Sequence, residues 1–405
     1  MTDQHRQDDS GQFARACSQA HRERLVEQLS AQGVLHAPHL AHALREIPRE
    51  AFVPAFYQRE DRPAMKWALR KAEEVEPLAW LELMYQDEPL VTKLDERQWP
   101  ISSSSAPSVM VRMLEALDVQ PGHRVLEIGT GTGYNAALLA RLAKHPADVT
   151  TIELDGALAE QAARALSLVV GPVEVRAKDG RMGEEAHAPY DRIIVTASAG
   201  YIPRPWYEQL APGGRLVMDL QGQQNASGFL VIEKSRDGSG ARGTFRQPPL
   251  HFMPLLDPET GGPHRSDRSL FQQACATEVR LEPASPLPRG LRDPAFCWFL
   301  QWFYRSLTVS LPFPLPGKTT ATLVLKDLAH ETVLQLNEQA DGGWQGKQRG
   351  AYPLWEQIER AYETFLSYQQ PTQERYEVVL SEEQAQLVLT GKGSHDALLL
   401  CDLYW

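Results

Sequence analysis

The sequence has few cysteines and no long apolar segment. Four cysteines occur among 405 residues, Cys17, Cys275, Cys297 and Cys401, and no two of them form a C-x-x-C pair. This scarcity excludes a disulfide framework and a cysteine-based zinc site, and it fits a reducing compartment. No apolar run approaches the roughly 18 residues that cross a bilayer, and the polar start MTDQHRQDDS lacks the apolar stretch of a secretion signal. We therefore expect a cytoplasmic protein with no membrane partner.

Positive charge is also scarce. The chain has 41 Lys and Arg against 52 Asp and Glu, which gives a formal net charge of -11. Nucleic acids attract proteins through basic surfaces, so the composition predicts no nucleic-acid partner. His36, His39 and His42 follow one another at spacings of three, but solvated positions on a helix explain them better than a metal site, and we predict no metal.

The length predicts two domains, because 405 residues exceed what one compact core usually holds. Residues 1–12 are polar and are expected to be disordered. Residues 13–256 are predicted to form the first domain, with an inserted charged stretch at about 58–83 that we interpret as helical. Residues 257–405 change to proline-rich and aromatic segments, and they are predicted to form an accessory α+β domain.

Strand-like and helix-like segments alternate through the second half of the first domain. The strand-like segments are RVLEI, VTTIEL, VEVRA, DRIIVTA and RLVMDL, separated by helix-like stretches at 133–145, at 156–169 and after Pro203. This pattern predicts an α/β fold in which helices cover a parallel sheet. FLVIEK (229–234) and LHFMPL (250–255) are predicted to complete the sheet, with an exposed loop at 235–249 between them.

A serine cluster precedes a helix predicted from Pro107 to about Leu117. It reads SSSSAPS, and hydroxyl groups at the start of a helix commonly accept hydrogen bonds from its first N–H groups. For Ser102 and Ser108 we favour this capping role over a role in a binding site.

Residues 125–140 read VLEIGTGTGYNAALLA, a strand-like run followed by glycines at every second position and then by a helix-forming tail. Glycine packs nothing and costs conformational entropy, so Gly129, Gly131 and Gly133 at the start of a helix indicate a ligand that lies against bare backbone. In a parallel sheet, such a loop brings backbone N–H groups to a nucleotide-like ligand at the C-terminal ends of the strands.

Residues at the ends of the following strands extend this candidate site. Glu153 ends the next strand, twenty residues after the last of these glycines and just before Leu154, and a carboxylate there can accept both ribose hydroxyls of an adenosine. Asp179 is placed to bind the adenine amino group and Gly180 to let the backbone approach; alternatively, the pair is simply a turn. Thr196 is predicted to line the site, with packing as the alternative.

Two ligand classes compete for this loop. Dinucleotide folds use G-x-G-x-x-G, whose spacing lets a helix N-terminus meet a pyrophosphate. The loop here is E-x-G-x-G-x-G, with Glu127 two residues before the first glycine. A carboxylate pointed into the pocket would repel a pyrophosphate but suit the ammonium of a methionine moiety, directly or through water. The pattern therefore favours S-adenosylmethionine over NAD.

These motifs together resemble the protein-L-isoaspartate O-methyltransferase family, from about His21 to Leu255. The segments that carry the resemblance are IPREAFVP, YQDEPL, SSSSAPSVM, LEIGTGTGYNAALLA, IELD, DGRMGEEAHAPYDRIIVTAS and LAPGGRLVMDL followed by FMPL. The resemblance implies a Rossmann-like class I S-adenosylmethionine-dependent methyltransferase fold, with an added C-terminal domain. It also implies that a peptide carboxylate is the methyl acceptor.

In that family a T-I-S-A-P-H segment overlies the methyl-transfer site, and its serine contacts the substrate carboxylate. Residues 103–107 fall on the first five positions of that segment, so the resemblance gives Ser105 this role, with Ser103 and Ser104 beside it as catalytic candidates. Ser104 and Ser108 stand where the family has isoleucine and histidine. The departures concern the substrate segment and leave the cofactor motifs intact.

The departures, the 58–83 insertion and the domain after Asp257 look like the relatives that accompany ribosomally made peptides in graspetide and lanthipeptide systems. This likeness implies methylation of an aspartate in a modified, macrocyclic precursor peptide, leading to an aspartimide or isoaspartate, with residues 257–405 recognising the peptide. Two alternatives stay open. One is repair of L-isoaspartyl residues in damaged proteins, and the other is a recognition subunit that binds peptide and S-adenosylmethionine without catalysis.

Overall fold

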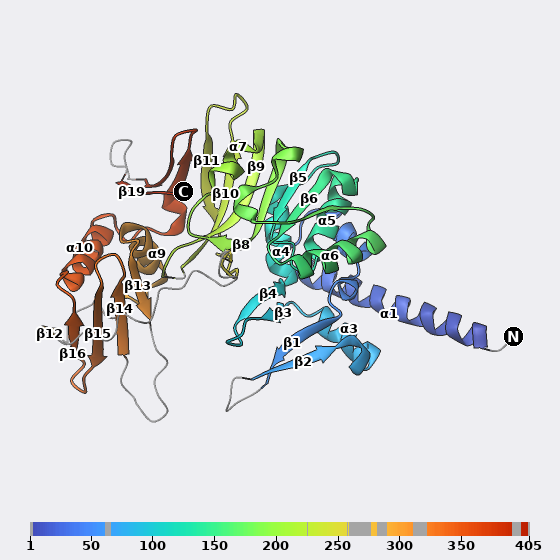
Figure 1. Ribbon diagram of the computed structural model, residues 1–405, viewed down its shortest axis with the longest axis horizontal. Helices are drawn as coiled ribbons and strands as arrows, with labels where there is room; N and C mark the ends of the chain where they lie inside the picture. Colours follow the sequence, from blue (N-terminus) through green and yellow to red (C-terminus); the bar gives the residue numbers. More distant parts are fainter. Residues whose placement is uncertain are drawn as a thin grey trace.

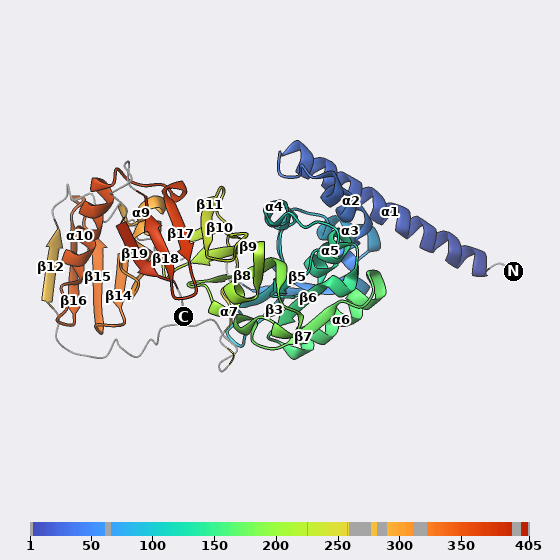
Figure 2. The same cartoon turned by 90° about the horizontal axis from the view of Figure 1, so that it is seen from above.

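The computed structural model describes residues 3–60, 66–224, 226–256, 258, 277–281, 290–310, 322–390 and 398–403. Three sheets organise these residues: one of ten strands at the centre, one of four strands beside it and one of five strands at the end opposite α1 (Figures 1 and 2). The ten-stranded sheet runs in the order β19-β18-β17-β11-β10-β9-β8-β5-β6-β7.

The parallel part of the central sheet confirms the predicted α/β fold. Its strands are β5 (Val125–Ile128), β6 (Val149–Glu153), β7 (Glu174–Ala177), β8 (Tyr190–Ala199) and β9 (Leu210–Gln221). The accompanying helices are α4 (Pro107–Leu117), α5 (Tyr134–Ala143), α6 (Gly156–Val169) and α7 (Arg204–Glu208). All of these elements fall on the segments predicted from the sequence.

The inner strands of this part, β5, β6, β8 and β9, are buried on both faces over most of their length, which explains their apolar runs, whereas the edge strand β7 is more exposed. Successive residues of one strand belong to different clusters of buried side chains: Ile193 and Val195 to one, Ile194 to the other. The first cluster also holds Trp206 of α7, and the second holds residues of α4 and α5 together with residues of the N-terminal helices.

The antiparallel half of the central sheet corrects two predictions. Its strands are β10 (Ser227–Lys234), β11 (Ala241–Arg246), β17 (Tyr376–Leu380), β18 (Ala385–Leu389) and β19 (Leu398–Asp402). Residues 235–249, predicted as a loop, contain β11, in which Ala241, Gly243 and Phe245 are buried and the residues between them are exposed. Residues 250–255, predicted as a strand, form only an isolated bridge at Pro254.

The N-terminal region differs from the prediction at two places. It consists of α1 (Asp3–Ala31), α2 (Pro38–Glu46), α3 (Pro77–Met84) and the sheet β2-β1-β3-β4, with β1 at Ala55–Arg59, β2 at Trp67–Lys71, β3 at Leu90–Leu94 and β4 at Pro100–Ser104.

Residues 3–12, expected to be disordered, lie in the first turns of α1; they contain no proline that would stop a helix. The 58–83 stretch, which was expected to be helical, is an α-helix only from Pro77 onward, in α3; its earlier part belongs to a hairpin, since β1 pairs with β2. Charged side chains reach solvent from either structure, so charge content could not distinguish the two. Pro63 in the middle of the stretch argues against a continuous helix.

The C-terminal part has the predicted mixed structure. A five-stranded antiparallel sheet contains β12 (Thr277–Leu281), β16 (Trp344–Arg349), β15 (Thr332–Glu338), β14 (Thr322–Asp327) and β13 (Leu307–Ser310), and the helices are α9 (Pro294–Phe303) and α10 (Leu354–Ser367). Its last strands join the central sheet, where β17 pairs with β11. One buried cluster contains Met218 of β9 together with Trp298 of α9 and Phe365 of α10. The two parts therefore share both a sheet and a core.

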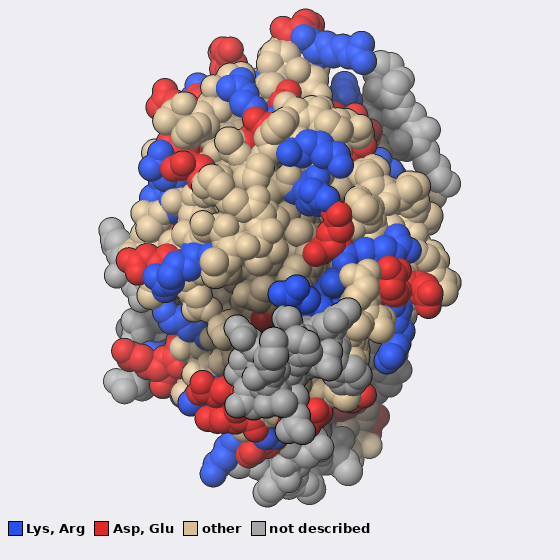
Figure 3. All heavy atoms as spheres, turned by 90° about the vertical axis from the view of Figure 1, so that its right-hand side faces the viewer, with Lys and Arg blue, Asp and Glu red and all other residues tan. Residues whose placement is uncertain are grey.

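The surface charge and the helices are relevant to nucleic-acid and membrane partners. On the face shown in Figure 3, basic and acidic side chains intermingle. Across the described part of the chain, every helix falls short of the combined length and apolarity that crossing a membrane requires.

Candidate active site

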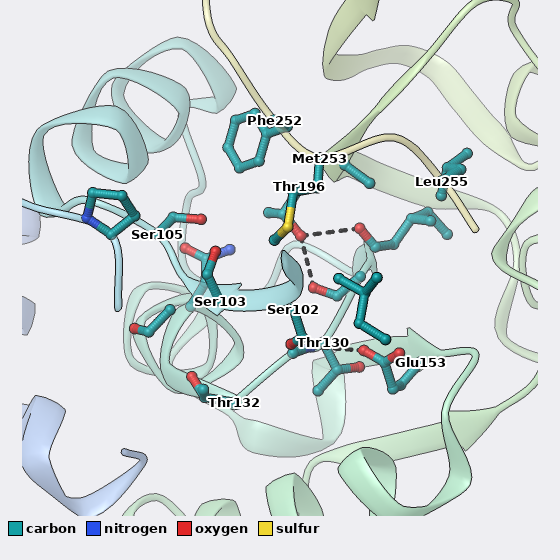
Figure 4. Close-up of a pocket in the computed structure, with 18 of the residues that line it drawn as sticks. Ser102, Ser103, Ser105, Thr130, Thr132, Glu153, Thr196, Phe252, Met253 and Leu255 are labelled. Carbon is teal, nitrogen blue, oxygen red and sulfur yellow. Dashed lines mark hydrogen bonds between the residues drawn. The ribbon is translucent and has the colours of Figure 1, made fainter. Parts of the chain in front are cut away.

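A cavity of about 420 Å³ opens at the C-terminal ends of the parallel strands. Two sets of residues line it (Figure 4). We call the first set the cofactor wall; it comprises residues 128–132, 134–135, 152–154, 179–180 and Thr196. We call the second set the substrate wall; it comprises the serine segment, residues 102–106, and the strap, residues 251–256. The volume lies in the usual range of small-molecule sites, roughly 300–1,000 Å³.

The glycine loop is shaped by backbone conformation and by one hydroxyl. Gly129 has a φ of +98°, which side chains rarely adopt, and a Cβ placed on it would lie 2.8 Å from Thr196 Oγ1. The Thr196 hydroxyl donates to Gly129 O at 2.6 Å. Gly131 has a φ of +52° and lies against the backbone carbonyl of Ser103. Thr196 lines the cavity as predicted, and it also fastens the loop.

Two of the predicted glycines serve close packing. Gly133 is absent from the cavity lining; a Cβ there would meet Ala162 Cβ of α6 at 3.2 Å, so this glycine lets α5 and α6 approach. Its predicted contact with the cofactor is not met in this structure. Gly180 does line the cavity, but a Cβ there would lie 2.6 Å from Ile128 Cγ2, so packing alone already requires glycine.

Glu127 lies behind the loop and is fully buried. Its carboxylate accepts hydrogen bonds from Asn135 Nδ2 at 2.7 Å and from Thr151 Oγ1 at 2.6 Å, and Thr151 in turn bonds Thr130 of the loop. Burial raises the pKa of Glu127 to about 7, while these two hydrogen bonds act against the rise. Glu127 is not part of the lining, so of the two predicted ways to meet an ammonium, directly or through water, the direct contact is not met.

Asn135 occupies the place that the sequence had assigned to Glu127. Its side chain lines the cavity, and its Oδ1 atom is buried without a hydrogen-bond partner among the described residues. A buried acceptor without a partner is costly unless a ligand or water satisfies it. This oxygen suits the ammonium of a methionine moiety.

Glu153 stands where the sequence predicted a sugar contact. One carboxylate oxygen accepts from Gly131 N–H at 2.8 Å and the other from Asp155 N–H at 3.1 Å. Burial raises the pKa of Glu153, and these backbone N–H groups oppose the rise. Glu153 and its neighbour Leu154 both line the cavity. The carboxylate is thus fixed against the loop and retains lone pairs for ribose hydroxyls.

Asp179 begins a short 3-10 turn and lines the cavity, so the two interpretations of the Asp-Gly pair are compatible. Arg181 Nε lies 3.0 Å from both of its carboxylate oxygens, which holds the carboxylate in one orientation. Trp206 of α7 also holds the turn, because its Nε1 donates to Gly180 O at 2.9 Å.

The serine segment alternates in burial along β4 and just beyond it. Ser103 and Ser105 are half-buried and line the cavity. Ser102 is buried and accepts from Thr92 Oγ1 at 3.1 Å, and Ser104 is buried and accepts from Arg49 Nε at 3.3 Å. Alternation follows from the extended backbone, in which successive side chains point to opposite faces. Ser103 and Ser105 therefore carry the hydroxyls available to a substrate.

The predicted serine cap of α4 is wrong. Ala106 is the N-cap residue, and no side chain of the serine cluster bonds the first N–H groups of the helix. Asp87 supplies the acceptor instead, because its Oδ1 atom receives the N–H of Ser108 at 2.8 Å. Ser108 itself is buried and is not part of the cavity lining.

Arg49 is a functional candidate that the sequence did not reveal. It is completely buried, and its guanidinium donates to five backbone carbonyls: those of Met84, Gln86, Glu88, Ser104 and Ser105, at 2.8–3.3 Å. No carboxylate among the described residues forms an ion pair with it. Burial lowers its pKa to about 10. Its place in IPREAFVP, between two prolines and among apolar residues, was the available signal.

The charges of the lining have a simple distribution. Among the described residues, the acidic side chains of the lining are Glu153 and Asp179, both on the cofactor wall, and no lysine or arginine lines the cavity. His251 contributes the imidazole of the strap. Ser105 and Glu153 lie at opposite ends of the view in Figure 4. A cationic ligand is thus favoured at the acidic end, and an anionic group at the other end meets neutral donors.

Within the described ranges, there is no group of three or more His, Cys, Asp or Glu residues that could hold a metal ion. Of the three spaced histidines, His42 lies 3.3 Å from Glu46 on the surface.

The chain is similar in sequence to curated enzymes. It is 42% identical over 233 residues to "Protein-L-isoaspartate O-methyltransferase 1" of Rhodopseudomonas palustris strain HaA2, which covers 56% of this chain and 78% of the relative. It is 36% identical over 243 residues to the "Protein-L-isoaspartate O-methyltransferase" of Methanopyrus kandleri, covering 59% of this chain and 92% of the relative.

A solved structure described as "Protein-L-isoaspartate O-methyltransferase" matches over 89% of this chain and 96% of its own, with a TM-score of 0.51 and 24% sequence identity. At this identity the likeness shows the fold alone. Residues 1–256 are only about 63% of 405, so the match includes much of the C-terminal part. A C-terminal part of this fold therefore also occurs in a solved structure of that name, although the 243 aligned residues already make up 92% of the Methanopyrus kandleri relative.

The protein-L-isoaspartate(D-aspartate) O-methyltransferase family model matches residues 20–260, a range that includes both walls of the cavity. S-adenosylmethionine is the cofactor, and the residues of the lining fit it: Glu153 would hold the sugar, Asp179 the base and the unpartnered Asn135 Oδ1 atom the ammonium. The chain belongs to the protein-L-isoaspartate(D-aspartate) O-methyltransferase family and is an S-adenosylmethionine-dependent carboxyl O-methyltransferase.

Proposed function

We propose that the enzyme methylates the free carboxylate of L-isoaspartyl residues in peptides and proteins. The names of the relatives at 36–42% identity support this substrate. The observation that carries the proposal is the joining, in one cavity, of an acidic cofactor wall with a substrate wall whose Ser103 and Ser105 hydroxyls face the cavity.

The chemistry needs no general base. A carboxylate with a pKa near 4 is ionised at pH 7, and the bound cofactor supplies an electrophilic methyl group on a sulfonium. The work of the chain is to orient the carboxylate and to exclude water. Ser103 and Ser105 can donate to the oxygen that does not attack, while Phe252 and Met253 of the strap cover the site with apolar side chains.

The described residues of the lining include no lysine or arginine, which suits this reaction. A cation paired with the carboxylate would stabilise the charged nucleophile more than the transition state, in which that charge is being neutralised. Hydroxyl donors orient the carboxylate with a weaker effect of this kind. The substrate wall can therefore bind the carboxylate without strongly reducing its nucleophilicity.

Methylation of an aspartate in a modified, macrocyclic precursor peptide has weaker support. Its sequence arguments were the departures at Ser104 and Ser108 and the second domain. Ser108 is not in the lining, the Ser104 hydroxyl is bonded to Arg49, and the fold of the C-terminal part also occurs in a solved structure that carries the isoaspartate name. These observations favour the isoaspartyl substrate.

Methyl transfer from labelled S-adenosylmethionine tests the proposal. The substrates are a linear L-isoaspartyl peptide, the same peptide with ordinary aspartate, and a side-chain-cyclised peptide that carries a free aspartate. We expect rapid labelling of the first and at least about a hundredfold slower labelling of the others. Preferential labelling of the cyclised peptide would instead establish the modified-peptide activity. No methyl gain on any of them, with cofactor binding intact by calorimetry, would favour a non-catalytic recognition subunit.

A further inference from the structure

The strap lies beside the central sheet without being one of its strands. Ser198 of β8 forms two backbone hydrogen bonds with it: Ser198 N–H donates to Met253 O, and Leu255 N–H donates to Ser198 O, each at 2.9 Å. The N–H of Phe252 donates to a side chain, since its acceptor is the Oδ2 atom of Asp219 at 2.9 Å. The N–H of Phe252 thus pairs with a carboxylate of β9 and not with a backbone carbonyl of a neighbouring strand.

Asp219 is completely buried, and it occurs within the otherwise apolar strand segment RLVMDL. Its Oδ1 atom accepts from the Ser227 hydroxyl, so hydrogen bonds reach both carboxylate oxygens. Burial raises the pKa of Asp219, and these hydrogen bonds oppose the rise. A buried carboxylate is costly and is tolerated only where such bonds compensate it. Its position therefore calls for an explanation beyond packing.

The C-terminal part fixes the residues that hold Asp219. Gln373, in the short 3-10 helix Gln373–Arg375 before β17, donates from Nε2 to Ser227 O at 2.7 Å. Gln301 of α9 is 1% exposed and donates from Nε2 to Ala226 O, also at 2.7 Å. Two glutamine amides from the C-terminal part thus grip adjacent carbonyls at the start of β10. Gln373 thus holds the backbone of Ser227, whose hydroxyl donates to Asp219, and Asp219 in turn accepts from the strap; Gln301 holds the residue before Ser227.

We propose that Asp219 is a positioning residue for methyl transfer, and that the C-terminal part sets the place of the strap through Ser227 and Asp219. The strap and the serine segment together form the substrate wall, so the place of the strap determines how closely a peptide carboxylate is enclosed. Misplacement by about 1 Å from a distant change can cost on the order of a hundredfold in rate. The inference rests on methyl transfer to a peptide, and the isoaspartyl peptide of the proposed function serves as its assay.

The test compares four variants with the wild type, using the full chain. Asp219→Leu removes the acceptor, Asp219→Asn keeps an oxygen for the Phe252 N–H, and Gln373→Ala removes the distant donor. Gln386→Ala is the matched control, because Gln386 lies on the neighbouring strand β18 and donates to Gln384, away from Ser227. The measurements are kcat and KM for the isoaspartyl peptide, Kd of S-adenosylhomocysteine by calorimetry, and Tm.

We expect kcat/KM to fall about tenfold to a hundredfold in Asp219→Leu and about threefold in Gln373→Ala, while Kd for S-adenosylhomocysteine changes less than about twofold. Asp219→Asn should recover most of the loss, and Gln386→Ala should match the wild type. In a Ser227→Ala background, Gln373→Ala should lose its effect, because the two changes act on one chain of contacts. Equal losses in kcat/KM and in cofactor affinity would overturn the inference, since they would indicate general damage.

Hydrogen–deuterium exchange gives a readout that needs no substrate. The amides of residues 251–256 should exchange about tenfold faster in Asp219→Leu, and faster also in Gln373→Ala, than in the wild type, with the α5 amides unchanged. Unchanged exchange in the strap would overturn the inference. A wild-type enzyme that ignores isoaspartyl peptides would refute the proposed function, and the exchange experiment would still decide this one.

Discussion

The cofactor wall and the substrate wall face one cavity but are built differently. On the cofactor wall, side chains such as Glu153 and Asp179 reach the cavity themselves, from the ends of consecutive parallel strands. On the substrate wall, the lining residues belong to two extended segments, and buried side chains that do not line the cavity hold these segments in place: Arg49 for the serine segment and Asp219 for the strap.

This difference predicts that substitutions will affect the two walls in different ways. A wall of direct contacts depends on a few residues at fixed places in a local motif. The substrate wall depends on residues that lie outside the cavity, Arg49 and Asp219, and any change that shifts these residues also moves the wall. If the two walls act separately, a change in one wall should alter either the affinity for the cofactor or the kcat/KM for the peptide, and not both.

The largest expected effect belongs to Arg49→Met. The change leaves carbonyls of the serine segment and of residues 84–88 without their donor, and unsatisfied buried acceptors are costly. We expect kcat/KM for an isoaspartyl peptide to fall at least about a hundredfold, with Kd for S-adenosylhomocysteine changed less than about threefold. Kinetics and calorimetry on the same preparation measure both quantities.

Arg192→Met provides the control for Arg49. Arg192 on β8 also bonds backbone carbonyls, those of Asp118 and Asp191, but at the other end of the strand from Thr196. We expect it to lower Tm without a comparable loss of kcat/KM, and Arg49→Lys, which keeps the charge but not the planar fork, to fall between. If the two methionine variants lost activity equally, the special role of Arg49 would be refuted.

The next effect should appear on the cofactor wall alone. Glu153→Ala removes the carboxylate expected to accept the ribose hydroxyls, so we predict a rise of about tenfold to a hundredfold in Kd for S-adenosylmethionine. KM for the peptide at saturating cofactor should stay within about twofold. Glu160→Ala, which removes an exposed carboxylate of α6 paired with Arg164, is the control. Unchanged cofactor affinity in Glu153→Ala would remove Glu153 from the site.

A smaller effect is expected from single hydroxyls of the serine segment. Ser105→Ala should lower kcat/KM about twofold to tenfold, the range for one neutral hydrogen bond, and leave cofactor affinity unchanged. Ser102→Ala should change neither, because the Ser102 hydroxyl accepts from Thr92. Steady-state kinetics on both variants measures these effects. Equal losses of kcat/KM would mean that exposure along the segment does not determine which hydroxyls contact the substrate.

The two walls also differ in how far the sequence predicted them. The strand, glycine loop, helix and the acidic residue at the next strand end are local patterns, so the cofactor wall was located within a few residues. Arg49 meets Ser104 across 55 positions and Asp219 meets Phe252 across 33, and no periodicity encodes such pairs. A single arginine between prolines and an aspartate inside an apolar strand were the only signals.

The extension of the sheet was missed for the same reason. β11 pairs with β17 across more than a hundred residues, and its sequence ARGTFR contains a single large apolar residue, Phe245, a composition that is also typical of a polar loop. The prediction of separate domains followed from treating the change in composition near Asp257 as a boundary. The chain instead returns to complete its first sheet, which places glutamines of the C-terminal part against β10.

Glu127 gives the smallest expected effect on activity, because it supports the cofactor wall without facing the cavity. Replacing it with Gln should change Kd for S-adenosylmethionine less than about threefold; a tenfold rise would restore the direct ammonium contact that the sequence predicted.

Stability should respond to pH instead. The folded state raises the pKa of Glu127 from 4.5 to about 7 through burial, so it binds a proton that the unfolded chain releases between these values. This contribution to the free energy of unfolding is fully present below pH 4.5 and is lost as pH rises through 7. Gln carries no such proton, so the stability of Glu127→Gln relative to the wild type should increase between pH 5 and 7.5, by at most about 1.4 kcal/mol per pH unit, and then level off. Denaturant unfolding of both proteins across that range measures the difference, and a difference that stays flat or falls with pH would mean that Glu127 is ionised in the folded enzyme throughout.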